Sequence, residues 1–243
     1  MKTWQKVSIG IAGSMLLIAA LAFWAVMGLR KTLYPPAPPM PAIVSQSMPE
    51  ILSQLESVLS TNAPSVLADL QPGISPGDIA KLETQYHIQL PDEIKAIYEW
   101  HNGSVNNTNR MSVFVPIHRF LPLEEALAER TASTIPEKSP LMLRVVYRIF
   151  VGHRDSWVCL FSDGAGDGYW FDLKRKPAEG AIFSSFSEDT SYTFFPSAKN
   201  LMAGVAACYE EGAFHFKKDS SPPQLEEDFN QSQKIWNRFG ASK

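Results

Sequence analysis

The chain has 243 residues, of which 45% are hydrophobic and 19% are charged, so its composition is that of a globular protein and excludes wholesale disorder. Its two cysteines, Cys159 and Cys208, are too few for a disulfide scaffold or a thiolate zinc cluster. The first 32 residues hold four of the 22 basic residues and none of the 25 acidic ones, so the remainder carries a formal net charge of −7. Direct binding to nucleic acid is not expected of such an acidic body, because each phosphate contact needs a basic side chain.

Residues 7–29 form an uncharged run of 23 residues after a short N-terminal tail, residues 1–6. At ~1.5 Å rise per residue, a helix of this length reaches about 34 Å and crosses a ~30 Å hydrocarbon core. We therefore predict a retained, single-pass transmembrane helix over residues 7–29, which makes the membrane one partner of the protein. The alternatives are a cleaved signal peptide, whose apolar region is shorter, and a buried core helix. Two basic residues on each side of the run leave open which side of the membrane the following domain faces.

The next segment, residues 30–48, is a proline-rich linker. Six prolines between residues 34 and 49 favour a stiff, extended spacer, with a ligand for a proline-recognition domain as the alternative. Residues 49–69 then hold a short amphipathic helix, at about residues 49–60, and a connection, because apolar residues recur there at helical spacing. These apolar residues are Ile51, Leu52, Leu55, Val58 and Leu59.

Two helix starts follow in close succession. Ser75-Pro76-Gly77-Asp78 combines an N-cap serine, a proline at the first helical position and an acidic first turn. Leu90-Pro91-Asp92-Glu93 starts a second helix in the same way, and Asn102-Gly103 is its expected left-handed stop. Because only a few residues join the two helices, we predict that they pack as a hairpin.

Runs of β-branched and aromatic residues, punctuated by glycines and acids, predict antiparallel strands after this hairpin. The runs are Ser112–Ile117, Tyr147–Val151, Ser156–Phe161, Tyr169–Leu173 and Ala181–Phe186. Further helices are expected at Leu123–Arg130, from Ser197 to about Glu211, and, as a polar helix within the C-terminal segment 217–243, at Gln224–Phe239. Helices, then a meander of strands, then helices again predict an α+β fold and not a parallel βαβ sheet.

Three short motifs match sites of known chemistry but lack its other requirements. Gly73-Ile74-Ser75-Pro76-Gly77 has the spacing of a hydrolase elbow, yet proline follows the serine and helix capping explains it. His153-Arg154-Asp155 lacks the asparagine of a kinase catalytic loop. The segment 163–168 lacks the ligands of a calcium loop, so we predict a tight hairpin turn there, with adventitious metal binding as the alternative. We expect no cofactor, no small-molecule substrate and no enzymatic activity, and keep an enzyme using scattered residues such as His101 and Asp167 as the minor alternative.

Several of these segments occur in a familiar order. Leu90-Pro91-Asp92-Glu93 and Tyr98-Glu99-Trp100-His101-Asn102-Gly103 are followed by Gly168-Tyr169-Trp170-Phe171-Asp172 and Phe195-Pro196-Ser197. This order resembles the SUKH superfamily, the Smi/Knr-type domain, over roughly residues 70–216. The resemblance implies a single SUKH-like domain in which an N-terminal helical hairpin packs on an antiparallel sheet. It also implies structural roles for Leu90, Pro91, Tyr98, Trp100, Gly103, Gly168 and Asp172.

The resemblance further implies protein binding without catalysis. Fungal members of the superfamily resemble interaction hubs in cell-wall assembly, and bacterial members resemble immunity proteins that neutralise secreted toxins, many of them nucleases. The long disordered flanks of the fungal branch are missing here, which favours a membrane-tethered immunity protein that sequesters a toxin. The alternative is a membrane-anchored scaffold or regulator in cell-wall or envelope maintenance. The partner's identity and the oligomeric state are left open.

The charge of the domain indicates what kind of partner to expect. A body at −7 attracts a basic protein, such as a nuclease-type toxin, and speeds its association. The candidate partner-binding residues are acids on predicted hairpin turns, for which ordinary turn chemistry is the alternative. They are Asp163, Asp167, Glu188 and Asp189.

Overall fold

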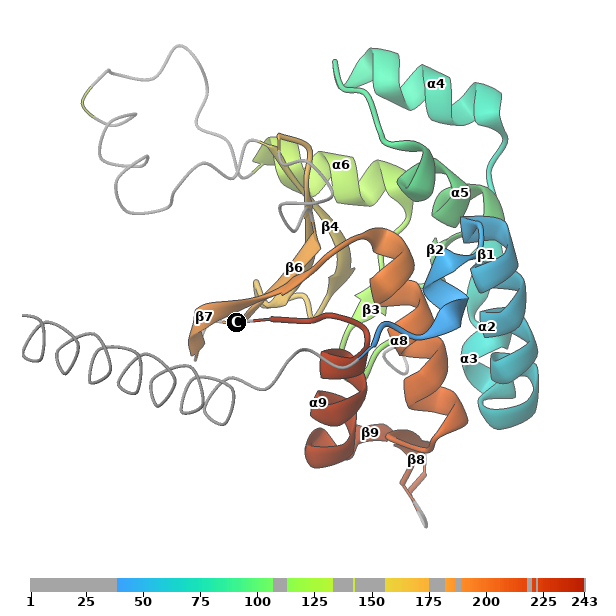
Figure 1. Ribbon diagram of the computed structural model, residues 1–243. Helices are drawn as coiled ribbons and strands as arrows, with labels where there is room; N and C mark the ends of the chain where they lie inside the picture. The colour runs from blue at the N-terminus through green and yellow to red at the C-terminus, as the bar shows by residue number, and fades with distance from the viewer. Residues whose placement is uncertain are drawn as a thin grey trace, which may run out of the picture. The chain divides into compact units, whose positions relative to one another are not determined.

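The computed structural model describes residues 39–106, 113–132, 142, 156–174, 182–186, 189–217, 220–221 and 223–242 (Figure 1). Pro39–Lys243 form one compact unit. None of the helices in the described ranges combines the length and apolar character needed to cross a membrane. The predicted transmembrane helix at residues 7–29 and the first part of the predicted linker, residues 30–38, lie outside the described residues.

The described part of the chain contains both helices and short strands. The helical elements are η1 (Ala42–Ser45), α2 (Met48–Asn62), α3 (Pro64–Ala68), α4 (Pro76–Gln85), α5 (Asp92–Trp100), α6 (Leu123–Ala132), α8 (Ala198–Glu210) and α9 (Phe229–Arg238). The strands are β1 (Leu70–Pro72), β2 (His101–Ser104), β3 (Arg119–Phe120), β4 (Trp157–Ser162), β5 (Gly168–Asp172), β6 (Ile182–Phe186), β7 (Asp189–Phe195), β8 (Phe214–Phe216) and β9 (Leu225–Glu227). The predicted α+β class is confirmed.

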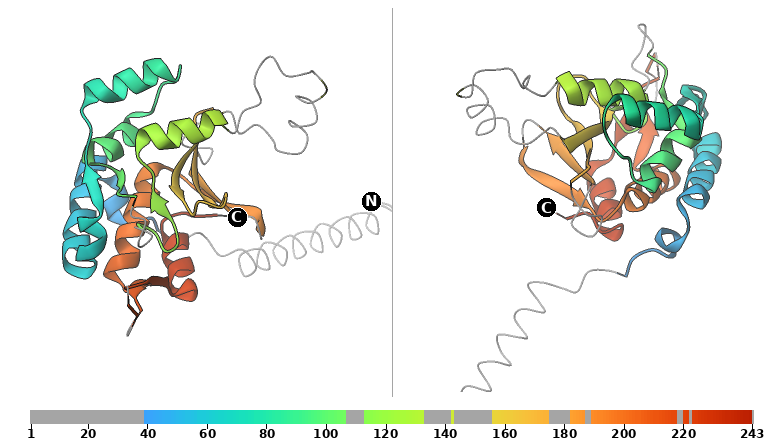
Figure 2. Two further views of the ribbon diagram at one scale, coloured as in Figure 1. Left: turned by 180° about the vertical axis from the view of Figure 1, so that it is seen from behind. Right: turned by 90° about the horizontal axis from the view of Figure 1, so that it is seen from above.

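The largest sheet is antiparallel with the order β3-β4-β5-β6-β7. Figures 1 and 2 show α8 between this sheet and α2. Aromatic contacts connect the sheet to the helices behind it, because the ring of Phe195 on β7 lies 5.4 Å from that of Trp236 on α9. α2 packs along α8 and also against α5. The core is therefore one continuous cluster that reaches from α2 to α9.

Helix starts are confirmed near the predicted positions for α2, α4, α5 and α8; three of them have capping contacts, while α5 has no side-chain cap at its N-cap Pro91. α2 begins with a capping box, in which Ser47 N donates to Glu50 Oε2 at 2.8 Å. α4 begins after Ser75, whose Oγ accepts from Asp78 N at 3.1 Å. In α8 the Ser197 hydroxyl accepts from Asn200 N at 3.3 Å. Each of these starts depends only on residues three positions apart, which is why the sequence alone reveals them.

The predicted stop of the second helix is wrong in its mechanism. α5 ends at Trp100, and Gly103 lies in β2, which pairs with β1. Gly103 does adopt a left-handed conformation, with φ 77°. Its lack of a side chain is needed because a Cβ there would lie 2.3 Å from the backbone nitrogen of Pro122. The expected hairpin is present, since α4 contacts α5, but it meets the sheet mainly through Tyr98, whose ring lies 5.5 Å from that of Phe120 on β3.

The strand predicted at Ser112–Ile117 is also wrong. Residues 114–118 form a tight turn in which His118 N donates to Val115 O at 2.8 Å and Phe114 N donates to His118 O at 2.9 Å. The strand in this region is β3, which starts only at Arg119. The strands predicted at Ser156–Phe161, Tyr169–Leu173 and Ala181–Phe186 are confirmed as β4, β5 and β6, while Tyr147–Val151 lies outside the described residues.

The C-terminal segment differs from its prediction as a polar helix beyond the domain. Leu225–Glu227 form β9, which pairs with β8, and α9 starts only at Phe229. Trp236 is 3% exposed and packs over Gly204 of α8, where a Cβ would lie 2.6 Å from the indole ring. Residues 225–239 therefore contribute to the same core as residues 48–59 of α2, because α2 and α9 both pack on α8.

Candidate functional site

Residues 114–118, which we call the Ile117 turn, expose an apolar side chain on a strained backbone. Ile117 is 61% exposed and has φ 62°, a left-handed conformation that a β-branched residue rarely adopts and that costs about 1–2 kcal/mol. The turn is firmly anchored, because Phe114 and Val115 are buried and the hydroxyl of Tyr209 donates to Phe114 O at 2.7 Å. Strain held in place by the surrounding core is a feature of binding and switch sites.

Residues 163–167, which we call the acidic loop, join β4 to β5. Asp163 Oδ1 accepts from the backbone nitrogens of Ala165, Gly166 and Asp167 at 2.8, 3.0 and 2.9 Å. Gly164 and Gly166 have φ 79° and 114°, so the predicted tight hairpin turn with positive φ is confirmed. One oxygen of Asp163 is thus committed to the turn itself, which favours turn chemistry for this residue, and partner binding by it stays a prediction.

The sheet register places the acidic loop beside the Ile117 turn. Arg119 pairs with Ser162, so the next step of the same antiparallel register brings His118 opposite Asp163. The His118 ring lies 5.4 Å from that of Tyr169 and its Nδ1–H donates to Pro116 O at 2.8 Å. Burial lowers the pKa of His118, while the hydrogen bond to Pro116 and the carboxylates of Asp163 and Asp167 act in the opposite direction.

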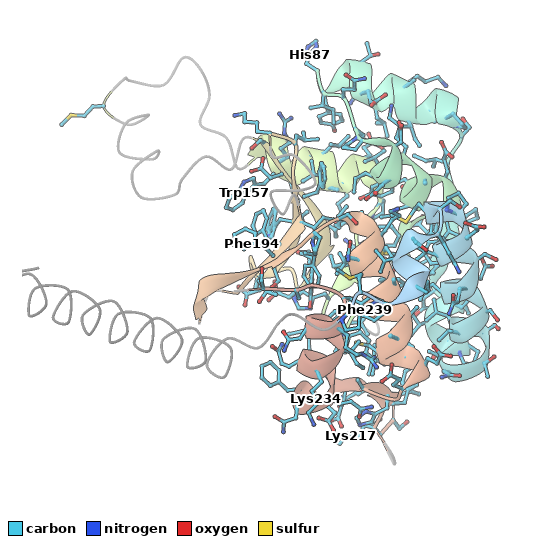
Figure 3. The ribbon with its side chains drawn as sticks, viewed as in Figure 1. His87, Trp157, Phe194, Lys217, Lys234 and Phe239 are labelled. Atoms are coloured by element: carbon cyan, nitrogen blue, oxygen red, sulfur yellow. The ribbon has the colours of Figure 1, made fainter. Side chains whose placement is uncertain are left out.

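A pocket of about 380 Å³ lies between the Ile117 turn and the paired strands β8 and β9. Its lining combines apolar and ionisable side chains: Pro116, Ile117, His215, Leu225, Glu226 and Glu227. Figure 3 places Lys217 at this end of the molecule. Lys217 Nζ lies 3.1 Å from Glu226 Oε1, and about half of each side chain is exposed.

Glu227 differs from an ordinary surface carboxylate. It lies at the exposed end of β9, and its carboxylate accepts a hydrogen bond from the buried Ser232 hydroxyl. Loss of water around the carboxylate raises its pKa, the Ser232 hydrogen bond opposes this, and the charge of Asp228 adds to it. A cation placed in the pocket would relieve this destabilisation of the ionised form.

A second, smaller pocket of about 180 Å³ lies where α2, α8, α9 and the chain around Ile43 meet. Its charged lining residues Glu211 and Arg238 already form an ion pair with each other. It also contains Glu210, an exposed acid on α8. Because Glu211 and Arg238 already neutralise each other there, this pocket offers less to a charged partner than the pocket beside Ile117.

The described residues do not gather a metal-binding or nucleophilic site. No group of three or more His, Cys, Asp or Glu in the described ranges is arranged to hold a metal ion. Burial raises the pKa of both thiols, Cys159 and Cys208, so neither forms a thiolate readily near neutral pH. What the described surface does offer is an exposed apolar side chain, Ile117, near two sets of carboxylates.

The structure unites only part of the predicted partner-binding set. Asp163 and Asp167 lie together in the acidic loop, whereas Glu188 lies outside the described residues. Asp189 begins β7, and its side chain is not described. The residues that sequence reasoning missed are Ile117, His215, Glu226 and Glu227, because the turn and the β8–β9 pair that bring them together carry no periodic signal.

The residues that the family resemblance marks as structural have identifiable contacts. Leu90 and Tyr98 are buried, and Pro91 is the N-cap of α5. Trp100 Nε1 donates to Glu56 Oε2 on α2 at 2.8 Å, and Asp172 Oδ1 accepts from Ser156 Oγ at 2.7 Å. A Cβ at Gly168 would lie 2.3 Å from the carbonyl oxygen of Phe161 on the neighbouring strand. These contacts join separate elements of the fold, as structural residues do.

Comparison with known proteins identifies the domain. No curated protein matches the chain. The model of the SMI1 / KNR4 family (SUKH-1) matches residues 73–203, a range that begins before α4 and ends within α8. This match includes the acidic loop and the Ile117 turn and covers more than half of the 243 residues. The chain therefore belongs to the SMI1 / KNR4 family (SUKH-1).

Proposed function

We propose that this protein is a membrane-tethered immunity protein that binds a basic toxin and blocks it stoichiometrically. Membership of the family supports a protein-binding role of the immunity or regulatory type, generally without catalysis. The observation that carries the finer proposal is the exposed, strained Ile117, whose turn lies beside the acidic loop and lines a pocket with Glu226 and Glu227. An apolar contact surrounded by like charges is the usual design of an interface that selects a partner of opposite charge.

The charge of the compact unit supports a basic partner. The four basic residues of the N-terminal end lie outside residues 39–243, which therefore hold 18 of the 22 basic residues and all 25 acidic ones. The unit carries a formal net charge of −7. Such a negative field accelerates association with a cationic protein. It also repels nucleic acid, the molecule that a nuclease toxin binds when it is not blocked. Blocking by occupation of the toxin surface needs no reactive group in the immunity protein.

The tether is supported by the sequence of residues 7–29, an uncharged run long enough for one membrane crossing. The prolines that follow it would hold the domain away from the bilayer surface. Protease digestion of intact cells tests which side of the membrane the domain faces, because a domain outside the membrane is cleaved and a domain inside is protected. Solubility of the full-length chain after high-salt and alkaline extraction would argue against the tether.

Immunity itself is tested by isolating complexes of the full-length chain from native membranes and then challenging cells with the recovered protein. We expect one protein at a one-to-one ratio, whose toxicity disappears when this chain is co-expressed. Absence of any stoichiometric protein, or toxicity that co-expression does not change, would contradict the proposal.

A membrane-anchored scaffold in cell-wall or envelope maintenance is the second candidate, and the apolar run followed by the proline-rich segment favours it. Deleting residues 1–32 separates the two. A scaffold loses its role when it leaves the membrane, whereas an immunity protein acting on a cytosolic toxin retains protection.

A further inference from the structure

We infer that the pocket between the Ile117 turn and strands β8 and β9 receives an arginine or lysine side chain that the protein partner carries next to an apolar residue. This inference rests on the proposed function and specifies the chemistry of the partner. It concerns the pocket lined by Pro116, Ile117, His215, Leu225, Glu226 and Glu227, none of which the partner-binding expectation from the sequence included.

The shape and lining of the pocket suit a long cationic side chain. Its volume of about 380 Å³ exceeds what one guanidinium group fills, so a neighbouring apolar side chain can enter with it. The rings and methyl groups of Pro116, Ile117 and Leu225 provide a surface for the methylene stem. Glu226 and Glu227 of β9 both line the pocket and give it the negative charge that attracts the cationic head.

The charge around the pocket selects a cation and excludes an anion. Glu226, Glu227 and Asp228 are consecutive, and the acidic loop lies beside His118 of the Ile117 turn. The cation that already pairs with Glu226 is Lys217, at 3.1 Å, with 52% of its side chain exposed. Such an exposed pair contributes little to stability and is readily exchanged, so an incoming guanidinium can replace the ammonium group of Lys217. An anionic lipid headgroup or a phosphate would instead meet repulsion.

Ile117 provides the apolar part of the contact. Its side chain is 61% exposed while the residues before it are buried, so the backbone of the turn holds an isoleucine outward at a measurable cost in strain. A residue with a lower cost at this position, such as asparagine or glycine, would satisfy the turn equally well. The presence of isoleucine is therefore explained by contact with an apolar group of the partner, which buries the side chain on binding.

The test uses the full-length chain in detergent micelles, with isoleucine methyl groups labelled for NMR. The probe is an end-blocked five-residue peptide that carries one arginine between two leucines, and the control peptide has citrulline, which is uncharged and nearly the same shape. We expect the arginine peptide to shift the Ile117 methyl signal and the His215 ring signals, with the buried Ile94 as an unshifted reference. The citrulline peptide should bind at least about tenfold more weakly.

Variants of the protein assign the binding to this pocket. Glu226→Gln combined with Glu227→Gln keeps the hydrogen-bonding shape and should weaken the arginine peptide about tenfold. Glu210→Gln, which removes one charge at the smaller pocket beside α8, should leave its affinity unchanged. Ile117→Asn should also weaken binding, through the lost apolar contact. Equal binding of both peptides would overturn the inference. Equal losses of affinity in the Glu226→Gln, Glu227→Gln double variant and in Glu210→Gln would also overturn it.

The outcome is distinguishable from that of the proposed function. If complexes from native membranes contain a stoichiometric toxin but the double glutamine variant binds it as tightly as the unchanged chain, the toxin is held elsewhere and the pocket assignment is wrong. If the arginine peptide binds as expected and no toxin is recovered, the pocket assignment stands and the immunity proposal fails.

Discussion

The hydroxyl of Tyr209 donates a hydrogen bond to the main-chain oxygen of Phe114 at 2.7 Å, and this buried contact joins α8 to the Ile117 turn. Tyr98 is buried to the same extent, yet its hydroxyl has no hydrogen-bond partner within the described part of the chain. The two tyrosines therefore allow a comparison in which the same atom is removed from a paired and from an unpaired position.

Tyr209→Phe is expected to lower the free energy of unfolding by about 1–2 kcal/mol, because Phe114 O loses its donor inside the core. Tyr98→Phe is expected to leave the free energy of unfolding unchanged or to raise it by up to about 1 kcal/mol, since the removed hydroxyl was buried without compensation. Urea denaturation of the full-length chain, followed by tryptophan fluorescence, measures both. Equal losses in the two variants would show that the Tyr209 hydrogen bond does not anchor the turn.

Ile117→Asn is expected to raise the free energy of unfolding by about 1 kcal/mol, because asparagine tolerates the left-handed backbone that isoleucine resists. The same variant should weaken binding of the partner, so stability and affinity change in opposite directions. Thermal denaturation and peptide titration of one preparation measure the two quantities. A variant that is less stable than the unchanged chain would refute the assignment of strain to Ile117.

His87→Gly is the matched control for relief of strain. His87 has φ 51° and ends α4 in a Schellman arrangement, with Ile88 N donating to Glu83 O at 3.0 Å. Its side chain is exposed at the far end of the molecule from Lys217 (Figure 3). Glycine should raise the free energy of unfolding by about 1 kcal/mol and leave peptide binding unchanged.

The buried His118 is expected to make stability depend on pH below neutrality. Because burial lowers its pKa beneath the ordinary value of 6.5, the unfolded chain takes up a proton before the folded chain does. Stability is therefore lost as the pH falls through 6.5 toward the folded pKa, with a slope of at most about 1.4 kcal/mol per pH unit from this residue. The slope should shrink in His118→Gln when urea denaturation is repeated between about pH 5 and about pH 8. An identical slope in the variant would mean that other groups dominate.

Two glycines in helices should respond in opposite ways to alanine. At Gly77 in α4 a Cβ would meet only Ser75 Oγ at 3.7 Å, so Gly77→Ala should raise the free energy of unfolding by up to about 1 kcal/mol. At Gly204 in α8 a Cβ would lie 2.6 Å from the Trp236 ring, so Gly204→Ala should lower it by about 1–3 kcal/mol. Calorimetry of both variants compares them directly. A gain in stability for Gly204→Ala would contradict the close packing of α9 on α8.

Local signals predicted the elements whose boundaries depend on neighbouring residues. The capping serine before α4 was recognised because Ser75 and its partner Asp78 lie three residues apart, and the start of α8 was recognised at Ser197. The strands β4 to β6 were recognised because their side chains are β-branched or aromatic. The short strands β1, β2, β8 and β9 were missed, since strands of three or four residues are defined by the chain they pair with.

The candidate site was predictable only in part, for the same reason. The acidic loop was predictable from its glycines and aspartates, because the Asp163 carboxylate accepts hydrogen bonds from backbone nitrogens of the same loop. Nothing in the sequence around Ile117 distinguishes an exposed isoleucine at φ 62° from a strand residue, and a strand was expected there. Glu227 is more than 100 residues away along the chain and meets Ile117 only through the pairing of β8 with β9.

The sequence by itself determined the α+β class, the starts of α4, α5 and α8, the family and the negative charge of the domain, because each of these is set by composition or by residues close together in the chain. The tertiary structure decided that the C-terminal helix completes the core over Gly204, and that Ile117 stands exposed near two groups of carboxylates. Those features depend on contacts between segments that are far apart in the chain. Such contacts decide which side chains are buried and which stay exposed.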